Sequence, residues 1–66
     1  MIDDPDIFRA AKLLIDQHGE DADIRAAERA DEVLDEGDTE GSALWRRVLE
    51  AIDELQRGRR DREPLN

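Results

Sequence analysis

The chain contains no cysteine and no tyrosine, and it has a single histidine, serine and tryptophan. Without cysteine, neither a disulfide nor a thiolate-bound metal can stabilise the fold, which fits a reducing compartment. A general base needs a nucleophile or an oriented acid as its partner, and the sequence offers no such set. We therefore expect no enzymatic activity, no cofactor and no metal site.

Long apolar runs are also lacking. No stretch approaches the roughly 20 apolar residues that a membrane-spanning helix needs. The first six residues include three aspartates, whereas a secretory signal would be basic and then apolar. We expect no membrane association and a cytoplasmic location.

Positive charge is scarce over most of the chain. Ten basic residues stand against 19 acidic ones, a net charge of −9. Residues 1–40 hold 14 acidic and four basic side chains (net −10), and residues 41–66 hold five and six (net +1). A body of this sign repels phosphate backbones, so we expect no direct nucleic-acid binding and favour basic partners.

A chain of 66 residues forms one small domain, near the lower size limit at which a single hydrophobic core suffices without disulfides or metal ions. Eight of its 25 apolar residues are alanine, which leaves only 17 larger ones. Burying most of these would give a marginally stable monomer, which binding to a partner would stabilise.

Three glycines, Gly19, Gly37 and Gly58, each follow a stretch in which apolar residues recur every three or four positions. This pattern predicts three amphipathic helices with short connections, and such connections favour antiparallel neighbours. The predicted helices run from Pro5 to about His18, from Ala22 to about Glu36, and from Asp38 or Thr39 to about Arg57. The predicted fold is all-α, a compact three-helix bundle over residues 1–58 with a flexible, disordered charged tail over residues 59–66.

Each predicted helix carries an apolar stripe, and we expect the three stripes to close on one core. Alanines in the second stripe would let a neighbouring helix approach closely. Trp45, on the strongest stripe, is expected to anchor the core. The predicted core consists of Phe8, Leu14, Ile15, Ala30, Val33, Leu34, Trp45, Val48, Ile52 and Leu55.

Three large aliphatic residues fall outside these stripes or at their edges. Leu13 projects from nearly the opposite side of the first helix, Ile24 lies well off the stripe of the second, and Leu49 flanks the stripe of the third. In so small a domain they form a candidate interaction patch.

Other candidate sites favour structural roles. His18, in the last turn of the first helix, suits a capping role. The acidic residues 35–40 resemble a calcium loop, but alternate positions 35, 37 and 39 are Asp, Gly and Thr. Ser42 invites comparison with the carrier serine of acyl-carrier proteins, which follows an Asp, but here Gly precedes it. The arginines near the C-terminus are interrupted by acidic residues and lack an aromatic for base stacking.

Residues 27–45 resemble the seam between two tetratricopeptide-type helical repeats, where a helix with small residues ends at a short turn and the next opens with a buried aromatic. The resemblance covers about 20 of the 66 residues and implies a helical hairpin. Its motif is Ala27-x-x-Ala30-x-x-x-Leu34-x-x-Gly37-Asp38-x-x-Gly41-x-x-x-Trp45.

Residues 8–55 resemble short, uncharacterised, largely alphaproteobacterial helical proteins classed as domains of unknown function. The resemblance implies a bacterial source and a compact helical fold, and it implies no activity. The shared block is His18-Gly19 … Arg29-Ala30-Asp31-Glu32-x-Leu34 … Gly37-Asp38 … Gly41 … Trp45-Arg46-Arg47-x-Leu49-x-Ala51-Ile52-x-x-Leu55.

Two functional hypotheses follow. The first is a non-enzymatic protein–protein interaction module that binds another protein or a second copy of itself as a homodimer. The alternative is an acidic regulator or nucleic-acid mimic that occupies a basic site on a partner protein, which the net charge of −10 over residues 1–40 favours.

Overall fold

The computed structural model describes residues 4–62, with side chains described for residues 4–58. Within this range the chain is helical except at Asp4 and residues 36–38, so the all-α prediction is confirmed. The elements are α1 (Pro5–His18), the 3₁₀ turn η1 (Gly19–Asp21), α2 (Ala22–Asp35) and α3 (Thr39–Arg62).

The helical residues of the described range form two uninterrupted segments, 5–35 and 39–62, and not three helices separated by loops. The first segment bends at Gly19, whose φ of 59° is left-handed and whose N–H donates to the Ile15 carbonyl. The Ala22 N–H then donates to the Gly19 carbonyl, so helical hydrogen bonding resumes at once through η1. The short connection predicted between the first two helices is therefore confirmed in position and length, but it is a 3₁₀ turn and leaves no irregular loop.

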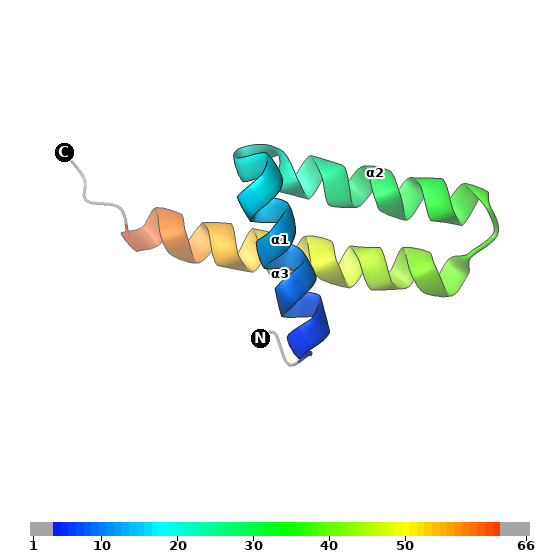
Figure 1. Ribbon diagram of the computed structural model, residues 1–66, viewed down its shortest axis with the longest axis horizontal. Helices are drawn as coiled ribbons and strands as arrows, with labels where there is room; N and C mark the ends of the chain where they lie inside the picture. The colour runs from blue at the N-terminus through cyan, green and yellow to red at the C-terminus, as the bar shows by residue number, and fades with distance from the viewer. Residues whose placement is uncertain (1–3, 63–66) are drawn as a thin grey trace.

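The arrangement of the helices is a hairpin with a crossing helix (Figure 1). α2 and α3 run antiparallel and in contact along their length, and α1 crosses α3 steeply. The antiparallel prediction is thus confirmed for α2 and α3 and wrong for α1 and α2. The shortest dimension of the molecule is 15 Å, about the thickness of two packed helical layers.

The turn between α2 and α3 satisfies the free backbone groups of both helices. Gly37 has a φ of 86° and donates its N–H to the Leu34 carbonyl over 2.9 Å. The Asp38 N–H donates to the Val33 carbonyl, also over 2.9 Å, which completes a Schellman motif. The Asp38 carboxylate then accepts the Gly41 N–H over 2.8 Å and caps α3.

The end of α3 differs from the prediction. Gly58 does not stop the helix, which continues to Arg62. A capping glycine adopts a positive φ, and among the described residues only Gly19 and Gly37 do so. The predicted end of the third helix near Arg57 is therefore wrong, because residues 59–62 continue α3. The division into a domain of residues 1–58 and a charged tail stays a prediction, and residues 63–66 lie outside the described residues.

The core is built mostly of alanine. Of the eight buried apolar residues, five are alanines, and Ile52 is the largest side chain that is fully buried. Three of these alanines lie on α2, where their spacing of four residues forms the packing face. The buried apolar residues are Ile7, Ala11, Ala22, Ala26, Ala30, Val48, Ala51 and Ile52.

The predicted core is confirmed in part. Ala30, Val48 and Ile52 are buried. The predictions for Phe8 and Leu34 are wrong, since these side chains are 39% and 43% exposed. Helices that touch through alanines leave little room between their axes, so larger side chains lie at the edges of the contact. The remaining predicted core residues are only half-buried: Leu14, Ile15, Val33, Trp45 and Leu55.

We predict that Ile52→Ala lowers the free energy of unfolding by about 2–5 kcal/mol, because it empties the centre of a core with little else to fill it. Trp45→Ala should cost less than Ile52→Ala, since Trp45 is half-buried at the edge of the core. Urea denaturation followed by circular dichroism measures both. Equal losses in the free energy of unfolding would contradict this ranking, and a larger loss for Trp45→Ala would show that Trp45 anchors the core.

We further predict opposite effects for two glycine-to-alanine changes in α3. A Cβ at position 41 would collide with the Asp38 carboxylate, so Gly41→Ala should displace the cap and lower the stability by about 0.5–2 kcal/mol. A Cβ at position 58 meets nothing within 4 Å, so Gly58→Ala should raise the stability by up to about 1 kcal/mol.

Thermal melts of both variants check this prediction, with Asp38→Ala as a control. Adding Gly41→Ala to Asp38→Ala should cost nothing further, because the cap is already absent. Strictly additive losses would contradict the proposed collision.

Candidate functional site: exposed apolar and acidic surfaces

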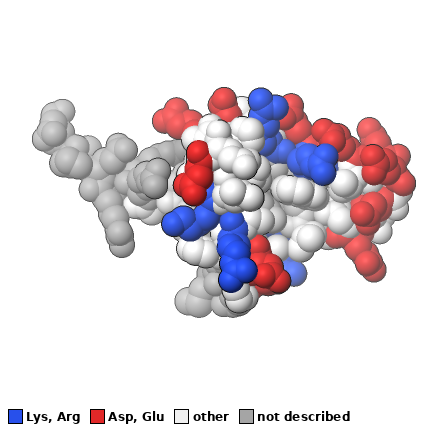
Figure 2. All heavy atoms as spheres, viewed as in Figure 1, with Lys and Arg blue, Asp and Glu red and all other residues white. Residues whose placement is uncertain are grey.

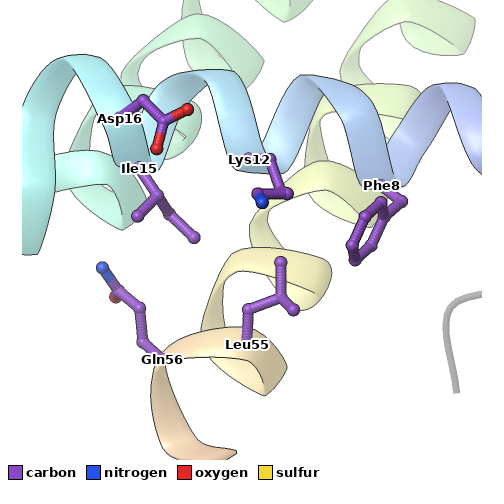
Figure 3. A pocket seen from close by; sticks show the side chains of 6 residues that line it. All are labelled: Phe8, Lys12, Ile15, Asp16, Leu55 and Gln56. Atoms are coloured by element: carbon purple, nitrogen blue, oxygen red, sulfur yellow. The ribbon is translucent and has the colours of Figure 1, made fainter. Parts of the chain in front are cut away.

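A hollow of about 200 Å³ lies where α1 crosses α3 (Figure 3). Side chains of α1 face Leu55 and Gln56 of α3 across the hollow, and Lys12 lies between Ile15 and Phe8 in this view. Residues four positions apart on α1 lie one above the other, which places them along the same wall. The lining residues are Phe8, Lys12, Ile15, Asp16, Leu55 and Gln56.

The lining of this hollow combines one ordered hydrogen bond with one pair of opposite charges. The Gln56 amide donates its Nε2–H to the Gly19 carbonyl over 2.9 Å and so ties α3 to the end of α1. Lys12 and Asp16 add one ammonium and one carboxylate, one turn apart. The lining contains no hydroxyl, thiol or imidazole group that could act as a nucleophile or shuttle a proton near neutral pH.

Large apolar side chains are more often exposed than buried in the described part of the chain. Only Ile7, Val48 and Ile52 are buried. Five others are exposed by 39–56% of their surface: Phe8, Leu13, Ile24, Leu34 and Leu44.

The three predicted interaction residues lie in different environments. Leu13 and Ile24, on α1 and α2, are each 56% exposed, so a partner could reach them. Leu49 is half-buried and packs against the core cluster, which makes it part of the packing. The structure therefore does not gather the three into one surface. Their role in binding stays a prediction.

Acidic side chains gather at the end of the hairpin where the turn joins α2 to α3 (Figure 2). Residues 31–40 include six acidic residues and no basic one. In the described part of the chain, no three His, Cys, Asp or Glu side chains are placed to hold a metal ion. This end of the molecule is accordingly a negatively charged surface.

Both arginines of α2 form ion pairs with glutamates of the same helix. Arg25 pairs with Glu28 over 3.4 Å and Arg29 with Glu32 over 3.1 Å, both at a spacing of three residues. The Arg29 guanidinium also lies 5.6 Å from the centre of the Trp45 ring, within range of a cation–π contact. Exposed pairs of this kind contribute little to stability.

Ser42 and His18 hold structural positions. Ser42 is 97% buried beside the turn, and its backbone N–H donates to the Asp38 carbonyl over 3.0 Å. A carrier serine must be reachable by a modifying enzyme, so the burial opposes that role. His18 lies half-buried in the last turn of α1, where the helix dipole favours a cation.

The hollow itself was missed by sequence reasoning. Phe8, Ile15 and Leu55 had all been assigned to the core, and their stripes on the two helices were visible in the sequence. The hollow exists because α1 crosses α3 steeply, and the crossing angle has no signature in either stripe alone.

No family model, curated protein or solved structure matches the chain. The resemblances to tetratricopeptide-type repeats and to alphaproteobacterial domains of unknown function therefore stay predictions. Within residues 4–62, no helix combines the length and the apolarity needed to cross a membrane.

We predict that replacement by glutamine lowers the melting temperature more at Leu49 than at Leu13 or Ile24. Leu13→Gln and Ile24→Gln should change the melting temperature by no more than about 4 °C, as expected for exposed positions. Leu49→Gln should lower it further, because the amide would enter the apolar contact at the core. Calorimetry of the three variants checks the order, and a Leu49→Gln melt equal to the other two would place Leu49 at the surface after all.

Proposed function

We propose that this protein is a non-enzymatic interaction module, which binds another protein through side chains on the outside of its helices. The observation that carries the proposal is the excess of exposed over buried large apolar side chains, five against three in the described chain. Covering such side chains in a complex removes apolar surface from water at roughly 25 cal/mol per Å². A core built largely of alanine also leaves the free protein with a small margin of stability, which a bound partner increases.

A second copy of the chain is one partner that this proposal includes. Homodimerisation would cover the exposed side chains by the simplest symmetry. The net charge of −9 opposes it at low ionic strength, so self-association should strengthen as salt is added.

A second candidate function is an acidic regulator, or nucleic-acid mimic, that occupies a basic site on another protein. The six acidic residues of 31–40, with no basic residue among them, favour it. Binding of this kind would weaken as salt is added, which distinguishes it from apolar association. For both candidates, the cytoplasmic location and the absence of enzymatic activity remain predictions.

We predict that the wild-type protein, immobilised as bait in a bacterial lysate, retains a protein partner that Leu13→Gln/Ile24→Gln bait captures at least about tenfold less well. The two baits have the same charge and differ only in exposed apolar surface, so the difference reports on that surface. Quantitative mass spectrometry at low and high salt measures it, and light scattering over a range of concentrations tests the homodimer.

Each outcome bears on one candidate. Capture that persists at high salt supports the apolar module, and capture of basic proteins that is lost at high salt supports the acidic regulator. A strictly monomeric protein that captures nothing with either bait would contradict both.

A further inference from the structure

The face of α2 that points away from the core contains one apolar side chain among carboxylates. At about 100° per residue, Ile24, Glu28, Asp31 and Asp35 fall within about 60° of one another, nearly opposite the buried alanines of the same helix. All four are exposed, and Ile24 is 56% exposed. We call these four residues the outer face of α2.

The charge of the outer face is largely uncompensated. Asp31 and Asp35 have no basic residue three or four positions away on the helix. Arg25 pairs with Glu28 at the border of the outer face, and Arg29 is held on the flank of α2 by Glu32 and the Trp45 ring, so Asp31 and Asp35 carry the uncompensated charge. Residues 20–40 as a whole contain ten acidic and two basic residues, a net charge of −8.

The contacts of α2 leave this face unpartnered. α2 packs on α3 and α1 through Ala22, Ala26 and Ala30, which lie on its other side. Solvation alone accounts for the carboxylates but gives no reason for an exposed isoleucine between them. A basic amphipathic helix would match this face, because its apolar side chain would contact the isoleucine and its basic side chains would contact the carboxylates.

We propose that the outer face of α2 is a docking surface for a basic amphipathic helix of another protein, which places a large apolar side chain against Ile24 and arginines or lysines against Asp31 and Asp35. This inference rests on the proposed interaction function and names its surface and the chemistry of its partner. A second copy of the chain fits this face poorly, because two such faces would oppose carboxylate to carboxylate. Phosphate backbones and anionic lipid surfaces are repelled for the same reason.

The test uses a synthetic helical peptide of about 18 residues, long enough to form a helix. It has one leucine near its N-terminal end and, on the same face, arginines four, seven and eleven positions further on, which are the spacings of the acidic residues from Ile24. A second peptide replaces the leucine by alanine, and a third has the same composition with its arginines spread around the helix. Titration into ¹⁵N-labelled full-length protein, followed by NMR, gives both the affinity and the location of binding.

Matched variants of the protein separate the contribution of Ile24 to binding from that of the carboxylates. Ile24→Ala should weaken binding of the leucine peptide by about tenfold, and Leu13→Ala, which has the same 56% exposure but lies on α1, should weaken it much less. Asp31→Asn/Asp35→Asn should weaken binding more than Asp16→Asn/Glu50→Gln, which removes the same charge from other exposed positions. The loss caused by Ile24→Ala should largely disappear with the alanine peptide, because the two changes remove one contact.

The expected result is a set of shifted amides confined to α2, with an affinity that falls as salt rises but persists at high salt, because the contact of the leucine with Ile24 is apolar. Equal binding of the peptide with scattered arginines, or equal effects of Ile24→Ala and Leu13→Ala, would overturn the inference and leave only non-specific charge attraction. Shifts centred on α1 or on the hollow would overturn the choice of face and leave the proposed interaction function standing. That function fails separately, if the lysate experiment captures nothing and the protein is monomeric.

Discussion

The close approach of α2 to α3 through alanine side chains is the contact on which the rest of the structure depends. Ala22, Ala26 and Ala30 repeat at four-residue spacing and are almost fully buried. Small side chains let helix axes come to the short end of the usual separation of about 8–10 Å. The hairpin is therefore narrow, and little space remains between its helices for a leucine or an aromatic ring.

The position of α1 follows from this narrow hairpin. The hairpin alone would leave Val48, Ala51 and Ile52 with few neighbours, and α1 covers this part of the core with Ile7 and Ala11. The bond from the Gln56 amide to the Gly19 carbonyl joins the end of α1 to α3. Because α1 crosses steeply, the helices diverge on either side of the crossing, and the hollow lined by Phe8 and Leu55 opens there.

Thin packing and uneven charge together account for the exposed apolar and acidic side chains on the outside of this protein. Large apolar side chains that find no room in an alanine core, such as Leu34 and Leu44, remain at the surface. The acidic residues concentrate along residues 20–40, whereas residues 41–58 of α3 contain three acidic and three basic residues. Apolar contacts strengthen and charge contacts weaken as salt rises, so salt dependence reports which of the two dominates in a complex.

Local features of the sequence determined the helices and most of their ends. The Asp4 carboxylate accepts the Asp6 N–H and caps α1, and Gly19 and Gly37 take the positive φ angles that end α1 and α2. These features depend on hydrogen bonds and dihedral angles within a few residues, which is why the sequence shows them. The apolar periods likewise assigned Val48 and Ile52 to the core.

Tertiary structure alone decided that Phe8 and Leu34 lie outside the core, that Leu49 packs inward, and that α1 crosses instead of lying antiparallel. Each of these depends on how closely two distant segments approach, and that distance is set by the combined volume of side chains from both, which no single stretch of sequence contains.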